Sequence, residues 1–194
     1  MKIGIYSGSY NPVHLGHVAL ADFIISKQFV DEIWMIRSPQ NPLKQSSTLI
    51  SDYHREKMLE IAVEGHEGLK VSTIEDNLPR PNYTINTLRE LKAQNPEYDF
   101  YLIVGADNWL IFDKWREWES ILSDFHLIVY PRPGYEMPLV DQKKYPTVQV
   151  IDAPLYDISS TEIRQKIALE ENPDNLIAPE VYKYIIENNL YQND

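Results

Sequence analysis

Cysteine is absent from the 194-residue sequence. Its absence excludes disulfide bonds, thiolate metal ligands and a thiol nucleophile, and it is compatible with a reducing compartment. Long hydrophobic runs are missing too: no segment approaches the length of a membrane span, and the opening "MKIGIYSGSYNP" lacks the apolar stretch of a signal peptide. We therefore expect a cytoplasmic protein.

Positive charge is also scarce. The sequence has 18 Lys and Arg against 29 Asp and Glu, which gives a formal net charge of −11. Such a surface repels nucleic-acid backbones and anionic membranes, so neither is expected as a partner. A small anionic ligand can still bind if the few basic side chains converge in one cleft. A homo-oligomer is compatible with the composition.

Two common nucleotide-binding signatures are missing as well. The sequence contains no G-x-x-x-x-G-K-[ST], which excludes a P-loop NTPase, and no G-x-G-x-x-G follows the first apolar run. A dinucleotide-binding Rossmann enzyme of the usual kind is therefore not expected.

The sequence does contain a regular alternation of strand-like and helix-like segments. Short apolar runs predict strands at 2–7, 32–37, 69–74, 98–105, 126–130 and 147–152. Periodicity predicts helices at 14–29, 51–63, 83–95 and, with breaks, 106–124, and two more from about Ser160 and Pro179. This order predicts a Rossmann-like α/β fold, a mostly parallel sheet with helices on both faces. We expect one domain over residues 1–194, with a small C-terminal helical portion from about residue 157.

The loops that carry unusual residues all follow predicted strands. They cover residues 8–14, 38–48, 76–82, 105–109 and 131–146. In parallel sheets, ligands bind beyond the carboxyl ends of the strands. The sequence therefore predicts a binding site along one rim of the sheet.

The first of these loops contains His14 and His17, with Gly16 between them, at the predicted start of a helix. The spacing places both imidazoles on one helix face. The unpaired N–H groups and the positive dipole end of a helix start attract anions, and Gly16 would let a ligand approach the backbone closely. In the alternative interpretation the histidines only cap or pack. A zinc site is disfavoured because no third histidine or carboxylate lies nearby in the sequence.

A second candidate anion site is the segment "ISSTEIR" near the C-terminal end. Ser159 and Glu162 have the spacing of a capping box, which is by default a structural device. Arg164, however, lies four residues after Ser160 and three after Thr161, so these side chains share one helix face. Hydroxyls, amides and a guanidinium that point together would bind an anion.

The segments "GSYNPVHLGH" and "ISSTEIR" together resemble the signature pair of the nucleotidyltransferase superfamily with the H-x-G-H motif. Between them, "NYTINTL", "GADNWLIFDKW" and "PRPGY" resemble segments of the bacterial nicotinate-nucleotide adenylyltransferases, in the expected order over nearly the whole chain. Two positions depart from the family. The first loop reads Ser7-Gly8-Ser9-Tyr10 where the family usually has Gly-Gly-[ST]-Phe, and Leu43 precedes Lys44 where the family often has a histidine.

This resemblance implies an enzyme of NAD biosynthesis that transfers the adenylyl group of ATP to nicotinate mononucleotide. The products are nicotinate adenine dinucleotide and pyrophosphate. A phosphate monoester has a second pKa of about 6, so the attacking group is largely dianionic at pH 7. A direct in-line attack therefore needs no general base and no covalent intermediate. Mg²⁺ is expected to arrive with ATP, held by phosphates and water, and no metal-ligating residues are predicted.

The resemblance also implies roles for particular residues. The catalytic group is His14, His17, Lys44 and Arg164. ATP would bind at Gly8, Ser9, Tyr10, Gly16, Gly105, Asp107, Ile158, Ser159, Ser160 and Thr161, and the mononucleotide at Thr84, Asn86, Thr87, Trp115 and Arg132. Three of these have structural alternatives: Lys44 as a solvated loop residue, Asp107 as a helix N-cap and Trp115 as a core residue.

Two other functions compete with this interpretation. One is an enzyme of the same superfamily that adenylylates another phosphate, such as phosphopantetheine, or that uses CTP. The segments "NYTINTL" and "PRPGY" argue against it. The other is a nucleotide-binding regulatory module without catalysis, which the presence of His14, His17, Lys44 and Arg164 together argues against.

Overall fold

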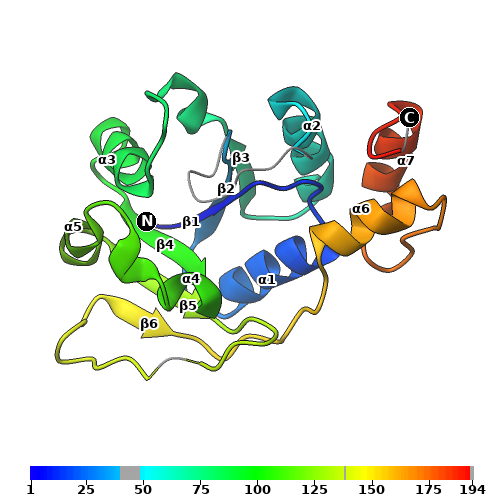
Figure 1. Cartoon of the computed structure of the whole chain (residues 1–194). Coiled ribbons are helices and arrows are strands. Elements are labelled where there is room, and N and C mark those ends of the chain that lie inside the picture. Colours follow the sequence, from blue (N-terminus) through cyan, green and yellow to red (C-terminus); the bar gives the residue numbers. More distant parts are fainter. Residues whose placement is uncertain (40–48, 138, 193–194) are drawn as a thin grey trace.

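The computed structural model describes residues 1–39, 49–137 and 139–192. Its centre is a six-stranded sheet in the order β3-β2-β1-β4-β5-β6, and all five strand pairs are parallel. The strands are β1 (Lys2–Gly8), β2 (Glu32–Arg37), β3 (Leu69–Ser72), β4 (Asp99–Gly105), β5 (His126–Tyr130) and β6 (Val148–Val150). The predicted Rossmann-like α/β fold is confirmed (Figure 1).

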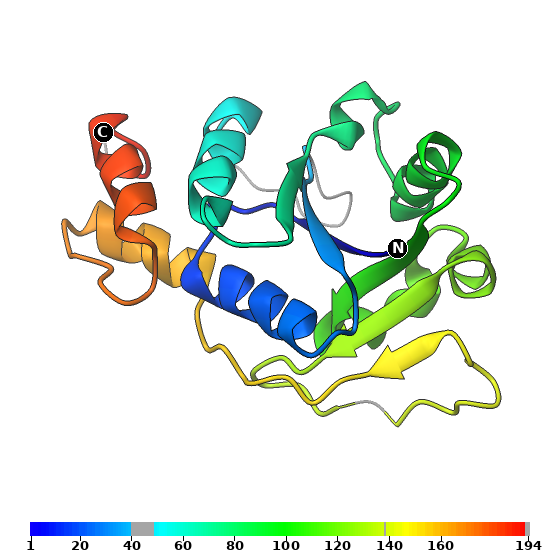
Figure 2. The same ribbon diagram turned by 180° about the vertical axis from the view of Figure 1, so that it is seen from behind.

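Helices cover both faces of this sheet (Figures 1 and 2). The helices are α1 (Leu15–Ser26), α2 (Asp52–Val63), α3 (Thr84–Gln94), α4 (Ala106–Trp109), α5 (Trp118–Asp124), α6 (Ser160–Ala168) and α7 (Pro179–Glu187), with 3-10 turns η1 (Ile74–Asn77) and η2 (Phe112–Lys114). Side chains of α1, α2, α6 and α7 join one apolar cluster, and those of α3 and α5 join another. None of the described helices is long and apolar enough to cross a membrane.

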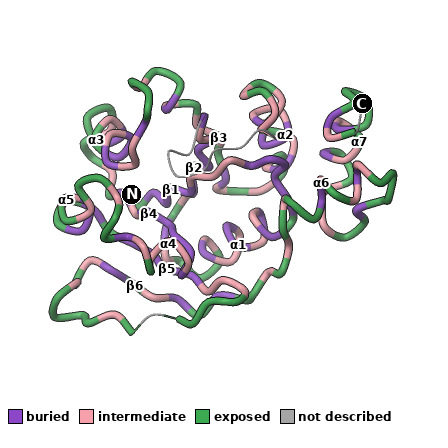
Figure 3. Tube along the Cα trace, in the orientation of Figure 1, coloured by how far each residue is buried: buried purple, intermediate pink, exposed green. Residues whose placement is uncertain are grey.

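The strands read as nearly continuous apolar runs because both of their faces are buried. In β1, Ile3 and Ile5 belong to the cluster of α3, whereas Tyr6 belongs to the cluster of α1. In β5, Leu127 and Ile128 alternate in the same way, as the two-residue period of a strand requires. Figure 3 shows the same result along the chain, with buried stretches on the strands and on the inner sides of the helices.

The strand order reverses between β1 and β4. From β1 the chain proceeds outward to β2 and β3, then returns to the centre and proceeds the other way through β4, β5 and β6. The crevice between neighbouring strands at such a reversal is where open α/β sheets bind ligands. The loops that follow Gly8 and Gly105 therefore border this crevice.

The segment predicted as one broken helix at 106–124 forms three short pieces, α4, η2 and α5. Glu117 adopts a left-handed backbone conformation with φ 52° directly before α5, which interrupts the helix. Trp109, Trp115 and Trp118 therefore form no helical stripe. All three are partly buried against the cluster of α3. Strand β3 also ends earlier than predicted, at Ser72, because η1 begins two residues later.

Near the C-terminal end, Tyr191 returns to the first loop of the chain. Its hydroxyl donates a 2.8 Å hydrogen bond to the Oδ1 atom of Asn11. Burial raises the pKa of the Tyr191 hydroxyl, so it remains a neutral donor at physiological pH. The bond links residues 180 positions apart and fixes the C-terminal helices against the loop that precedes α1.

Arg55 on α2 holds together two of the loops at the rim. Its side chain is fully buried, and its guanidinium donates to the carbonyl oxygens of Ser9 at 2.6 Å and Ser38 at 2.8 Å. The same group pairs with Asp52. Arg55 is therefore a structural residue.

We expect the substitution Arg55→Met to lower the free energy of unfolding by about 3–5 kcal/mol, because it leaves buried carbonyl oxygens and a carboxylate without their partner. Urea unfolding followed by circular dichroism measures this change. The matched control is Arg80→Met, since Arg80 is 58% exposed and makes only a 3.4 Å pair with Asp52 among the described residues. Its effect should stay below about 1 kcal/mol. Equal losses for the two variants would contradict the role of Arg55.

Candidate active site

The structure brings the starts of α1 and α6 together. The Ser160 hydroxyl donates to the carbonyl oxygen of Pro12 at 2.8 Å, and Nη1 of Arg164 donates to that of Asn11 at 2.7 Å. Both acceptors lie just before the histidine pair of α1. In Figure 1 the start of α6 accordingly lies beside the loop that enters α1. Two helix N-termini distant in sequence thus share one rim of the molecule.

The two imidazoles form a stacked pair at the start of α1. Their ring centroids are 3.6 Å apart and their planes differ by 26°. His14 is the N-cap residue, and its backbone N–H donates to Nδ1 of His17 at 3.2 Å. Since Nδ1 of His17 accepts this bond, the neutral ring carries its proton on Nε2. His17 therefore presents an N–H donor on its other side.

Both histidines are neutral at physiological pH. Burial, reinforced by the nearby Arg132 guanidinium, lowers the pKa of His14 to about 3. Burial also lowers the pKa of His17 well below its usual value, and His14 and Arg132 contribute to that shift. The pair therefore offers hydrogen-bond donors, and among the described residues the positive charge beside it comes from Arg132, Arg164 and the helix dipoles.

Arg132 lies with the histidines. It lines a pocket together with His14, His17, Tyr6 and Tyr130. Its Nε atom is 3.6 Å from Oδ1 of Asp107, so these two side chains form an ion pair. A residue predicted to bind the mononucleotide is thus placed among residues predicted to bind ATP.

Glycines at this rim permit close contacts between protein groups. A Cβ atom on Gly105 would overlap the Asp107 carboxylate and would lie 2.6 Å from Cγ of Arg132. At Gly16, a Cβ atom would meet Cβ of Tyr156 at 3.1 Å and Nδ1 of His14 at 3.2 Å. Tyr156 and His14 therefore fill the side of Gly16 that a Cβ atom would occupy. Gly16 also lines the pocket that contains His17 and Arg132, and the approach of a ligand to its backbone stays a prediction.

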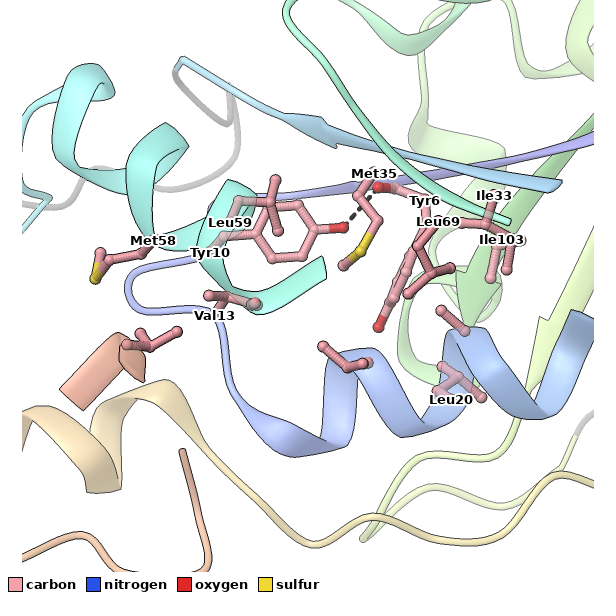
Figure 4. Packing of buried hydrophobic residues seen from close by; sticks show 14 of the residues in the cluster. Tyr6, Tyr10, Val13, Leu20, Ile33, Met35, Met58, Leu59, Leu69 and Ile103 are labelled. Carbon is pink, nitrogen blue, oxygen red and sulfur yellow. Dashed lines mark hydrogen bonds between the residues drawn. The ribbon is translucent and has the colours of Figure 1, made fainter. Parts of the chain in front are cut away.

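Tyr10 also differs from the expectation that it lines the nucleotide's path. Its side chain is only 2% exposed, and its hydroxyl donates to the carbonyl oxygen of Tyr6 at 2.6 Å (Figure 4). Its ring packs edge-on against His17 at 5.0 Å and lies against Gly8. The Tyr10 side chain thus supports the imidazole pair from inside the core. Gly8 and Ser9, beside it, are half-buried.

The start of α6 agrees with the prediction of a capped helix. Ser159 is the N-cap, and its hydroxyl accepts from the backbone N–H of Thr161 at 3.2 Å. Nη2 of Arg164 donates to the hydroxyl of Thr161 at 3.2 Å, which confirms that these side chains share one helix face. Ser159 and Thr161 are exposed, whereas Ile158 packs against the core. This helix start therefore offers polar groups to solvent beside the histidine pair.

The predicted mononucleotide residues on α3 divide into two kinds. Thr84 begins the helix, and it and Asn86 are half-buried. Thr87 instead is 1% exposed, and its hydroxyl donates to Oε1 of Glu75 at 2.9 Å and accepts from Asn82 at 3.0 Å. Because that hydroxyl is committed to the interior, a contact of the Thr87 side chain with a ligand is not supported.

Trp115 is partly buried, with its ring 5.0 Å from that of Phe112. Its Nε1 atom is buried and has no hydrogen-bond partner among the described residues. The indole therefore has an unused donor, and its packing is compatible with both the core and the ligand interpretation. Leu43 and Lys44 lie outside the described residues.

Among the pocket residues that were not singled out from the sequence are two tyrosines at strand ends. Tyr6 and Tyr130 line the pocket, and their hydroxyl oxygens are 3.4 Å apart. Each stands near the carboxyl end of an otherwise apolar strand, and that position is the signal that could have indicated them. Within the described ranges, no group of three or more His, Cys, Asp or Glu side chains could hold a metal ion.

Known proteins are similar to this chain in sequence and in fold. Residues 5–166 match the family model described as Cytidylyltransferase-like. A Bacteroides fragilis protein described as "Probable nicotinate-nucleotide adenylyltransferase" is 44% identical over 187 residues, which cover 96% of this chain and 92% of that protein. Plasmodium falciparum nicotinic acid mononucleotide adenylyltransferase complexed with NaAD has a TM-score of 0.80 at 25% identity, over 98% of this chain and 97% of that chain. The same protein complexed with APC has a TM-score of 0.81 at 25% identity, over 98% and 96%.

The fold and the matched family model define the class of protein as a nucleotidyltransferase. The sequence identity of 44% over nearly the full length of both chains indicates which nucleotidyltransferases this chain belongs with. This chain belongs to the cytidylyltransferase-like family and, within it, to the nicotinate-nucleotide adenylyltransferases. The resemblance carried by the sequence motifs is thereby confirmed.

The low pKa of His14 predicts a pH dependence of stability. In the unfolded chain a histidine takes up a proton below a pKa of about 6.5, whereas His14 in the folded protein stays neutral down to about pH 3. Unfolding therefore binds a proton in this window, and the free energy of unfolding falls as the pH is lowered. For His14 alone the loss is about 2 kcal/mol at pH 5.

Chemical denaturation at pH 7 and pH 5 tests this prediction. The fall in the free energy of unfolding should be smaller in a His14→Gln variant, which retains a polar side chain and has no titrating ring. An equal fall in both proteins would show that His14 is not buried in its neutral form.

Proposed function

We propose that this protein transfers the adenylyl group of ATP to nicotinate mononucleotide by direct in-line attack. A phosphate oxygen of the mononucleotide forms a bond to the α-phosphorus of ATP. The bond from that phosphorus to the bridging oxygen of the β-phosphate breaks, and the electron pair leaves with pyrophosphate. The observation that best supports this proposal is the meeting of the two helix starts, with the imidazole pair on one and Arg164 on the other.

The charges of the site suit a reaction between two anions. His17, with its proton on Nε2, would donate to the α-phosphate, and His14 would donate beside it. Neutral donors stabilise charge that develops in the transition state without requiring an acidic medium. Since the pKa of His14 is about 3, it is a weak base, and its role would be to donate a hydrogen bond rather than to remove a proton.

The other ATP contacts would follow from the two helix starts and the central crevice. Ser159, Ser160, Thr161 and Arg164 would hold the β- and γ-phosphates, together with Lys44. Gly8, Ser9 and Gly105 would border the nucleotide through their backbones. Asp107 would lie on the ribose side of the nucleotide. Ile158 would contribute apolar contact only. Mg²⁺ would be carried by the ATP phosphates and water, as the lack of an acidic cluster among the described residues suggests.

The second substrate would lie between α3 and Arg132. The helix start at Thr84 would receive the carboxylate of the pyridine ring. The backbone N–H of Asn86 already donates to the carbonyl oxygen of Tyr83 at 2.8 Å, so Asn86 would contribute through its side chain. Trp115 would contact the ring. Because Arg132 lies beside both histidines, it would hold the mononucleotide's phosphate where that phosphate meets the α-phosphate of ATP. One guanidinium there reduces the repulsion between the two reacting anions.

Steady-state turnover with ATP and Mg²⁺, measured by released pyrophosphate, tests this proposal. The acceptors to compare are nicotinate mononucleotide, nicotinamide mononucleotide and phosphopantetheine, and CTP replaces ATP in a parallel series. We expect the highest kcat/KM for nicotinate mononucleotide with ATP. Preference for phosphopantetheine or CTP would contradict the proposal. Binding of ATP without turnover on any acceptor would instead support a non-catalytic module.

The substitution His17→Ala separates catalysis from stability. Loss of one preorganised donor to a developing charge costs about 10²–10³ in kcat, so we expect a fall of that size in turnover. The free energy of unfolding should fall by only about 1 kcal/mol, the worth of one capping interaction. Turnover and urea unfolding are measured on the same preparation. Intact activity with a large loss of stability would refute the role of His17.

A further inference from the structure

Glu75 is a buried acidic residue to which neither the resemblance nor the mechanism assigns a role. It lies on η1, just after β3, and its side chain is 5% exposed. The hydroxyl of Ser38 donates to its Oε2 atom at 3.0 Å, and the hydroxyl of Thr87 donates to its Oε1 atom at 2.9 Å. One carboxylate thereby connects the loop that leaves β2, the loop that leaves β3 and the first turn of α3.

Burying the Glu75 carboxylate costs free energy, and its two hydrogen bonds have fixed directions. Burial raises the pKa of Glu75, while the hydroxyl groups and the nearby Arg37 act against that rise. Arg37 is itself buried at the end of β2, where it pairs with Asp76. An apolar side chain at position 75 would avoid the desolvation cost, so stability alone does not favour a carboxylate here. What a carboxylate supplies is two acceptor atoms that hold two hydroxyl donors in fixed positions.

The start of α3 has particular need of such an anchor. Its N-cap is Tyr83, which makes no side-chain capping bond. A Ser or Asp at that position would occupy the first N–H groups of the helix and fix their direction. In α3 the helix is instead held from the inner side, through Thr87, four residues later. The first N–H groups of α3 are therefore not occupied by a capping side chain, while the bond from Thr87 to Glu75 fixes the orientation of the helix.

We propose that Glu75 is the positioning residue of the mononucleotide subsite, because it fixes the first turn of α3 against the loop that leaves β2. The inference rests on the proposed function, in which that turn receives the substrate carboxylate. Glu75 touches neither substrate and acts through Thr87 and Ser38.

The test is a comparison of the two Michaelis constants in Glu75→Gln. Glutamine has nearly the same shape but one acceptor atom fewer, so it cannot accept from both hydroxyls. We expect the KM for nicotinate mononucleotide to rise about tenfold, with the KM for ATP within twofold of wild type. The matched control is Glu64→Gln, an exposed residue just after α2, which should leave both constants unchanged.

A second variant removes one anchor only. Ser38→Ala should raise the KM for the mononucleotide about threefold, and combining it with Glu75→Gln should give less than the product of the two effects, because both act through one carboxylate. Ser38→Ala also provides the test if Glu75→Gln does not fold.

The outcomes are distinguishable. Absence of turnover by the wild-type protein overturns the proposed function and this inference with it. Turnover by the wild type, with both constants raised equally in Glu75→Gln and Ser38→Ala, overturns this inference alone and leaves the function standing. Unchanged constants with a lowered melting temperature also overturn it, since they assign Glu75 a purely structural role.

Discussion

All five strand pairs in the sheet are parallel, and that constraint decides where everything else lies. A parallel sheet returns each strand to the same edge, so every loop that follows a strand begins at one rim. The reversal of strand order between β1 and β4 opens that rim at its centre. The histidine loop and the Gly105 loop meet there, and the start of α6 closes the third side through its bonds to Asn11 and Pro12.

An acidic protein that handles anionic ligands must concentrate its few cations. Here the two histidines are neutral. In the described part of the chain, the formal positive charges near them are arginines that already have protein partners: Arg132 pairs with Asp107, and Arg164 donates to a backbone carbonyl and a hydroxyl. Buried Arg55 and Arg37 serve the framework. Some arginines thus lie beside the histidines and others stabilise the fold. The site can therefore receive anions, and none of these arginines leaves an uncompensated charge inside the protein.

Sequence reasoning predicted the order of strands and helices well, because long apolar runs and helical periodicity are local signals. At 106–124 it predicted a helix with breaks, which the structure confirms, but it could not place the break at Glu117, because no glycine or proline marks that left-handed residue. It also identified the two helix starts, α1 and α6, that meet at the rim. It could not predict that the side chains of Thr87 and Tyr10 are buried behind that rim. Their burial depends on hydrogen-bond partners, Glu75 and Tyr6, whose contacts form only in the folded chain.

The bond from Tyr191 to Asn11 has a consequence for how the protein matures. A domain generally folds as a unit, and the chain is synthesised from its amino-terminal end. The loop before the histidines contacts β1 through the bond from Tyr10 to Tyr6, yet three of its contacts come from residues 160, 164 and 191. A chain synthesised only as far as β6 can therefore hold all six strands and still lack the contacts that complete the rim, because residues 160, 164 and 191 follow β6 in the sequence.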